Sequence, residues 1–161
     1  MLDAYLDIET TGLSPSISRI TVIGVGLARG KSIEHVQLYD NSLTRSALEK
    51  ALAGATRLYT YNGARFDLPF IAECLGLDLA QRLRHHDLMH DCWRQGLYGG
   101  LKAVEARLGI GRKVVGVNGY QAVLLWQRYE QYGDAHALET LLAYNREDVG
   151  NLLHLRQKLH C

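Results

Sequence analysis

Two acidic residues, Asp7 and Glu9, stand two positions apart at the end of a short apolar segment that opens the chain. Because side chains alternate along a strand, both carboxylates are expected on one face of it. Unpaired acids beside a buried strand are unfavourable, and a bound cation would relieve their repulsion. A solvated strand end before a loop would explain the same residues equally well.

Two later segments carry further candidates. Asp67 lies in the first turns of a predicted helix, where an acid also stabilises the helix through its dipole. Tyr144 and Asp148 are four residues apart on a long predicted helix, so they are neighbours on its surface. Each feature alone has a plain structural explanation, since charged helix faces are usually only solvated. A functional interpretation therefore depends on the three segments together.

The order of these motifs resembles that of a known enzyme family. Asp-x-Glu, then Asn-x-x-x-Phe-Asp ending at Asp67, then Tyr-x-x-x-Asp ending at Asp148 resemble the exonuclease motifs of the DEDD (DnaQ-like) superfamily, in its tyrosine-bearing DEDDy subtype. The segment from Leu101 to Ile110 and the later Tyr-Asn-Arg-Glu-Asp-Val string are similar to the YprB-like ribonuclease H-like branch. The resemblance spans nearly the whole chain and implies a metal-dependent 3′-to-5′ exonuclease.

The resemblance also implies roles for individual residues. Four acids would be metal ligands, namely Asp7, Glu9, Asp67 and Asp148. Tyr144 would complete the catalytic set by orienting the water that attacks the terminal phosphodiester, because a phenol with a reference pKa of about 10 suits hydrogen bonding better than proton abstraction. Asp87 corresponds to a supporting position and not to a ligand.

Phosphodiester hydrolysis explains why such an enzyme needs crowded acids. Two divalent cations about 4 Å apart can activate a water and stabilise charge on the reacting oxygens. All-oxygen ligands favour Mg²⁺ or Mn²⁺ over zinc, which usually recruits Cys or His. The formal net charge of +1 is weak evidence for a polyanionic partner, but two bound ions would raise it to about +5. We therefore expect two Mg²⁺ or Mn²⁺ ions and metal-dependent affinity for nucleic acid.

The pattern of apolar residues predicts an α/β protein, and the family resemblance implies that its fold is ribonuclease H-like. Three strands open the chain as an antiparallel meander, and helices then alternate with two more strands to give a five-stranded mixed sheet flanked by helices. The predicted strands are 2–8, 19–28, 31–39, 57–61 and 82–86, and the predicted helices include 44–53, 64–75 and 135–159. On the last helix, Tyr144 and Asp148 are expected on the flank of the apolar stripe, near an edge of the core.

Length and composition indicate one ordinary compact domain over residues 1–161. The chain has 47% hydrophobic and 22% charged residues, and only two prolines. No apolar run is long enough to span a bilayer, and no export signal is apparent, so no membrane association is expected. Three cysteines form no close pair, which argues against a disulfide framework and favours a cytoplasmic protein.

Substrate contacts are expected beside the motifs and at a glycine-rich turn before Leu101. The candidates are Thr10, Asn62, Arg65, Lys102 and Arg146. Aromatic residues on the later helices are assigned to packing; they are Trp93, Tyr120, Trp126 and Tyr129. His86 and His90 could suggest a histidine-aspartate phosphohydrolase, but those enzymes are all-helical and this chain opens with strands.

The leading hypothesis is an exonuclease acting on the 3′ end of single-stranded DNA or RNA. A partner protein that delivers the substrate is part of this hypothesis. A noncatalytic nucleic-acid-binding module of the same fold is the main alternative, and an endonuclease is a second one. Because all four acids are present, loss of the catalytic site is not indicated.

Overall fold

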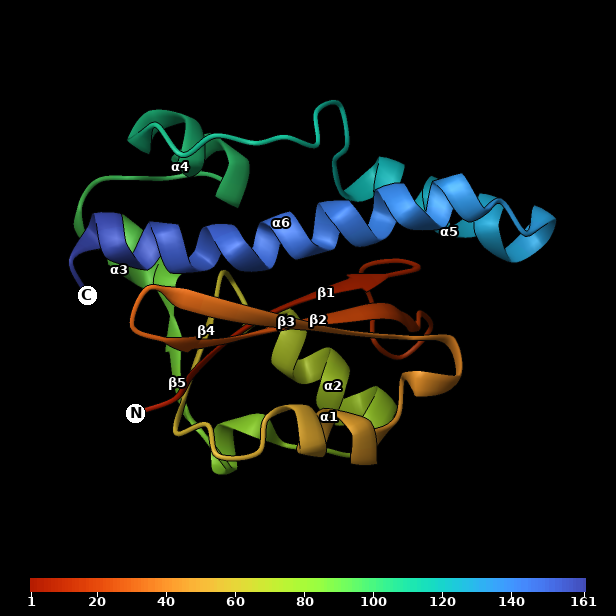
Figure 1. Cartoon of the computed structure of the whole chain (residues 1–161), viewed down its shortest axis with the longest axis horizontal. Coiled ribbons are helices and arrows are strands. Elements are labelled where there is room, and N and C mark those ends of the chain that lie inside the picture. Colours follow the sequence, from red (N-terminus) through yellow and green to blue (C-terminus); the bar gives the residue numbers. More distant parts are fainter.

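The computed structural model describes all residues 1–161. A central β-sheet lies between helices on both of its faces (Figure 1). The five strands are β1 (Asp3–Thr10), β2 (Ile20–Arg29), β3 (Ser32–Tyr39), β4 (Arg57–Thr60) and β5 (Arg84–Asp87). They lie in the order β3-β2-β1-β4-β5, with β1 antiparallel to β2, β2 antiparallel to β3, and β4 parallel to both β1 and β5. The predicted five-stranded mixed sheet is confirmed.

Helices cover both faces of the sheet (Figure 1). One face carries α1 (Arg45–Ala51) and α2 (Asp67–Leu75). The opposite face carries α3 (Leu88–Arg94), α5 (Gly119–Tyr132) and the long α6 (Ala135–Leu159), and α5 packs against α6. Helix α4 (Leu101–Leu108) lies on the far side of α6 from the sheet. Single 3₁₀ turns lie at Asp40–Ser42 and Leu79–Gln81. No helix is both long and apolar enough to cross a membrane.

Strand β1 positions the first two acids through simple alternation. Ala4, Leu6 and Ile8 belong to the core beneath α1 and α2. Tyr5 points the other way, into the core beneath α6. Since side chains alternate along a strand, Asp7 and Glu9 continue the α6 face of the sheet. The two carboxylates thus face a part of α6 that presents polar side chains to the sheet.

Helix α6 begins and ends where the sequence predicts. Asp134 caps its first turn by accepting from the backbone N–H of Ala137, and His160 ends it in the left-handed conformation with φ 57°. The buried face of α6 is wider than the predicted apolar stripe. Tyr144 and Asp148 are buried instead of lying on the flank, because α6 turns its polar residues toward the ends of β1 and β2.

The start of α2 also differs from the prediction. A helix was expected from Ala64, but α2 begins at Asp67. Residues 63–66 form a turn, and Phe66, with φ −120° and ψ −73°, has a backbone that is not helical and precedes the helix as its N-cap. Asp67 is therefore the first residue of the helix. The predicted helix at 44–53 is confirmed as the slightly shorter α1, with Thr44 as its cap.

Candidate active site

Three carboxylates from two distant parts of the chain meet at one point. Ligand oxygens of Asp7, Glu9 and Asp148 all lie within 4.8 Å of one another. Asp7 and Glu9 come from β1, and Asp148 comes from the middle of α6. The spacing is short enough for a single cation to contact more than one of them.

Asp67 stands beside this trio and is held by the backbone of β1. Its Oδ2 accepts from the Ile8 N–H at 3.0 Å, and the side chain is buried. Its charge is close enough to raise the pKa of Asp7. The four predicted acids therefore converge, although Asp67 lies outside the tightest cluster.

Burial and mutual repulsion raise the pKa values of these acids. The pKa of Asp7 lies well above its usual range because of burial first and the charge of Asp67 second. Burial and then Asp7 raise the pKa of Glu9 in the same way. Burial raises the pKa of Asp67 to about 7, against the opposing effect of the Ile8 N–H. An oxygen-only donor set of buried, mutually repelling carboxyl groups fits a hard divalent cation such as Mg²⁺ or Mn²⁺.

Asn145 of α6 fixes the position of Asp7. Its Nδ2 donates to the main-chain oxygen of Asp7 at 3.1 Å and to Asp7 Oδ2 at 3.2 Å. Its Oδ1 accepts from Gln37 Nε2 at 3.0 Å, so the amide cannot turn over without losing its partners. Sequence reasoning placed Asn145 in an apolar stripe and missed this role; a buried Asn among leucines was the available signal.

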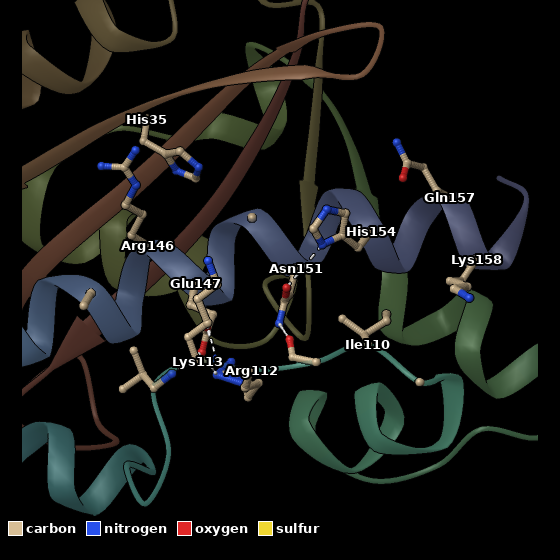
Figure 2. Close-up of a pocket in the computed structure, with 15 residues that line it drawn as sticks. His35, Ile110, Arg112, Lys113, Arg146, Glu147, Asn151, His154, Gln157 and Lys158 are labelled. Atoms are coloured by element: carbon tan, nitrogen blue, oxygen red, sulfur yellow. Dashed lines mark hydrogen bonds and ion pairs between the residues drawn. The ribbon is translucent and has the colours of Figure 1, made fainter.

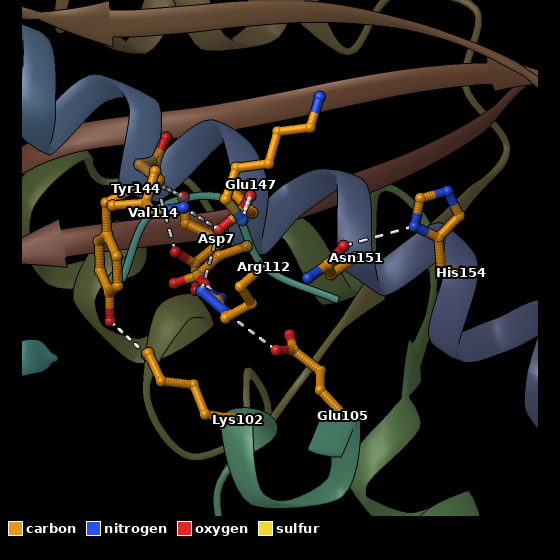
Figure 3. A network of polar contacts seen from close by, with 12 residues as sticks. Asp7, Lys102, Glu105, Arg112, Val114, Tyr144, Glu147, Asn151 and His154 are labelled. Atoms are coloured by element: carbon orange, nitrogen blue, oxygen red, sulfur yellow. Dashed lines mark hydrogen bonds and ion pairs between the residues drawn. The ribbon is translucent and has the colours of Figure 1, made fainter. Parts of the chain in front are cut away.

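Tyr144 and Lys102 form the second polar feature of the site. Lys102 of α4 donates to the Tyr144 hydroxyl, and its Nζ lies 4.5 Å from the centre of the phenol ring (Figure 3). Burial raises the pKa of Tyr144, and the nearby charge of Glu9 adds to the effect. The phenol is therefore protonated at neutral pH and can both donate and accept a hydrogen bond.

Arg112 supplies a buried positive charge beside the acids. Its guanidinium contacts Asp148 and donates to Glu105 Oε2 at 2.9 Å (Figure 3). Glu105 is only 1% exposed, and burial raises its pKa while Arg112 lowers it. This buried pair was not predicted from the sequence; the available signal was Glu105, an acid next to the buried Val104 on α4.

Asp87 supports the turn that leads to Asp67. Its carboxylate accepts from the backbone N–H groups of Asn62 at 2.8 Å and Ala64 at 3.1 Å, and it also caps α3 through Met89. These bonds hold the turn in place without bringing Asp87 into the acid cluster. The observed contacts agree with the supporting position expected for this residue.

A cavity of about 630 Å³ opens over the acids. It is lined by Asp7, Glu9 and Asp148, by Thr10 and Tyr144, and by apolar groups that include Leu13, Phe66 and Tyr120. The assignment of Tyr120 to packing was wrong, because this residue is the second of α5 and is 69% exposed. Trp126 and Tyr129 do pack together, while Trp93 is partly exposed.

The comparison with protein families matches the RNase_H superfamily model over residues 4–160. The chain belongs to the RNase_H superfamily. This membership accounts for the five-stranded mixed sheet. No curated protein sequence matches the chain.

Solved structures share the fold of this superfamily member. A family B DNA polymerase from the archaeon Pyrobaculum calidifontis aligns with a TM-score of 0.70 at 18% identity, covering 99% of this chain and 24% of that one. NrnC from Brucella melitensis with bound Mg²⁺ gives 0.64 at 20% identity, covering 98% and 71%. NrnC bound to pGG gives 0.65 at 21% identity with the same coverage. The chain thus spans about a quarter of the polymerase and most of NrnC.

The predicted substrate contacts of this RNase_H superfamily member lie in different places. Thr10 lines the acid cavity, and Lys102 reaches Tyr144. Asn62 lies in the turn held by Asp87, and Arg65 is exposed nearby. Arg146 does not line the acid cavity but a second groove on α6. His86 contacts Asp91 at the end of the sheet, apart from the acids, so the phosphohydrolase alternative is wrong for this fold.

Proposed function

We propose that this protein is a 3′-to-5′ exonuclease of the DEDDy type, which removes nucleotides from the 3′ end of single-stranded nucleic acid. The observation that carries the proposal is the meeting of Asp7, Glu9 and Asp148 in one cavity with the Tyr144 phenol. Asp67 adjoins them from the start of α2. Superfamily membership makes phosphodiester hydrolysis the reaction that best fits these groups.

The acids would hold two divalent cations, Mg²⁺ or Mn²⁺. Asp7, Glu9 and Asp148 are close enough to share ions, and the charge of Asp67 is near enough to act on both Asp7 and Glu9. Such ions supply charge stabilisation on phosphate oxygens and lower the pKa of a bound water. The bound Mg²⁺ in the NrnC structure supports this choice of ion.

Tyr144 would orient the attacking water by hydrogen bonding. Its phenol stays protonated because burial raises its pKa, so it is unsuited to act as a general base near neutral pH. Lys102 fixes the direction of the hydroxyl by donating to it. The oxygen is then left with one proton to donate, and the water that receives it is held with a lone pair free for attack.

The cavity favours a terminal nucleotide over a duplex. Its volume of about 630 Å³ is in the usual range for small-ligand sites. Tyr120 and Leu13 are both exposed at its lining, and exposed aromatic and apolar groups stack well on unpaired bases. The complex of NrnC with pGG adds support for a nucleic-acid substrate.

A labelled single strand tests the proposal directly. In Mn²⁺, the parent protein is expected to shorten a linear DNA or RNA strand from its 3′ end and to leave a circular strand intact. Asp7→Asn removes a central acid and should abolish shortening, whereas Glu34→Gln, an exposed site on β3, should not. Strand binding without degradation would identify a noncatalytic module, and cutting of the circle would identify an endonuclease.

A further inference from the structure

A second hollow runs along the outward face of α6, beside the acid cavity. It has a volume of about 1020 Å³ and extends from the segment 109–114 on one side of the helix to His35 of β3 on the other (Figure 2). We call it the α6 groove. It is larger than the acid cavity, and none of the roles assigned above explains it.

The α6 groove carries positive charge that nothing in the protein neutralises. Lys113, Arg146 and Lys158 are exposed at its lining, and none of their side chains forms an ion pair or hydrogen bond within the chain. Arg146 lies close enough to His35 to help burial lower the pKa of that imidazole. Unpaired cations along a hollow are an electrostatic footprint for a polyanion.

The one acid in the lining is already engaged. Glu147 accepts from the backbone N–H groups of Lys113 at 2.7 Å and Val114 at 3.1 Å, and it also faces Arg112. Asn151 holds the same segment by donating to the Gly111 carbonyl oxygen at 3.4 Å. The wall of the groove is therefore fixed in advance, so binding there does not require the wall to become ordered.

Arg112 joins the α6 groove to the acid cavity. It lines the groove and contacts Asp148, which lines the cavity. Figure 3 shows polar side chains continuing from Tyr144 past Arg112 to Asn151 and His154. Arg112 therefore brings one positive charge to the lining of the groove and to an acid of the cavity, so the two hollows are neighbours on α6.

We propose that the α6 groove binds the phosphate backbone of a single nucleic-acid strand whose 3′ end lies among the acids. The inference rests on the proposed exonuclease function and adds to it a preference for strands longer than a dinucleotide. Arg146 and Lys158 are twelve positions apart on α6, which is roughly 18 Å along the axis. Since phosphates follow one another by at least about 3.4 Å along a strand, the groove spans up to about five of them.

The experiment compares two variants that lose the same charges at different places. Arg146→Gln/Lys158→Gln neutralises the groove. Lys50→Gln/Arg84→Gln is the control, because Lys50 on α1 and Arg84 on β5 are exposed and unpaired and lie outside the groove. Binding of a fluorescent single strand of about 12 nucleotides is measured by anisotropy across a salt series, with Ca²⁺ in place of Mg²⁺. Hydrolysis of the same strand, and of a dinucleotide, is measured separately with Mn²⁺.

The groove variant should bind the long strand about tenfold more weakly, and its salt slope should fall by about 1.4, as expected for two lost phosphate contacts on a single strand. The control should match the parent, and both variants should hydrolyse the dinucleotide at the parent rate. Equal binding of the long strand by groove variant and parent, or an equal loss in the control, would overturn the groove assignment. Absence of hydrolysis by the parent would overturn the exonuclease proposal alone, because strand binding reports on the groove independently.

Discussion

The side-chain amide of Asn145 donates to both the main-chain oxygen and the carboxylate of Asp7, at 3.1 and 3.2 Å, across 138 positions of sequence. The amide reaches β1 because the neighbouring strand β2 has glycine at position 24. A Cβ there would overlap Asn145 Oδ1 and would lie 2.9 Å from a methyl of Val149. The position of the first acid therefore depends on an atom missing from the adjacent strand.

Gly24→Ala should displace Asn145 and loosen Asp7. Gly26→Ala is a matched control, because a Cβ there would press on Ile33 and Val149 of the same interface without touching Asn145. Both variants should lose about 1–3 kcal/mol of unfolding free energy through overpacking, measured by urea denaturation. Only Gly24→Ala should also lose affinity for Mn²⁺. Equal Mn²⁺ affinity in the two variants would remove Asn145 from the account of the site.

Tyr144→Phe should separate turnover from metal binding. Removal of the hydroxyl leaves the carboxylates in place, so kcat on a single strand is expected to fall about 10²-fold while Mn²⁺ affinity stays at the parent value. Tyr5→Phe is the control, since that buried phenol accepts from Arg156 at 2.8 Å beneath the same helix and does not line the acid cavity. A kcat for Tyr144→Phe equal to that of the parent would exclude the proposed orienting role.

Arg112→Met should destabilise the protein strongly. The substitution removes the guanidinium that donates to Glu105, which is 1% exposed and has one oxygen without any partner even in the parent. Removing one member of a buried pair typically costs about 3–5 kcal/mol. Replacing both, in Arg112→Met/Glu105→Leu, should recover much of this loss, as measured by chemical denaturation. If the double variant were less stable than the single one, charge burial at Glu105 would not be the cause.

The raised pKa of Asp67 gives a pH dependence with a definite sign. Between the usual aspartate value near 3.8 and the native value of about 7, the native protein holds a proton that the unfolded chain has released. This contribution to unfolding free energy is therefore lost as pH rises toward 7. In EDTA, the melting temperature of the parent relative to Asp67→Asn should fall across this window, while added Mg²⁺ should raise it most at the upper end. A difference that stays constant with pH would contradict the assigned pKa.

The elements of the fold could be predicted because local signals agreed with the tertiary structure. Alternation placed Asp7 and Glu9 on one face, and α6 has the predicted bounds Ala135–Leu159. The exact burial of α6 could not be read from apolar spacing, because Asn145 and Asp148 are buried through bonds to residues far away in the chain. A polar residue is expected to be exposed unless the distant residue that satisfies its hydrogen bonds is known.

The residues that surround the acids were harder to anticipate for the same reason. Lys102 reaches Tyr144 across 42 positions, and Arg112 reaches Asp148 across 36. Such pairings depend on how α4 and the following segment fold back over α6, which no local pattern specifies. Exposure of Tyr120 was likewise missed, because it lies in the first turn of α5, before the part of that helix that packs against α6.

The number of Mn²⁺ ions bound by the protein tests the central claim most directly. Titration followed by electron paramagnetic resonance, which reports free Mn²⁺, can be run on the parent and on Asp7→Asn without any substrate. Two ions per chain are predicted for the parent, and a loss of most of this binding is predicted for the variant, because Asp7 clusters with Glu9 and Asp148 and also lies within range of the charge of Asp67. No bound Mn²⁺ in the parent, or the same binding in both proteins, would contradict a two-metal nuclease centre.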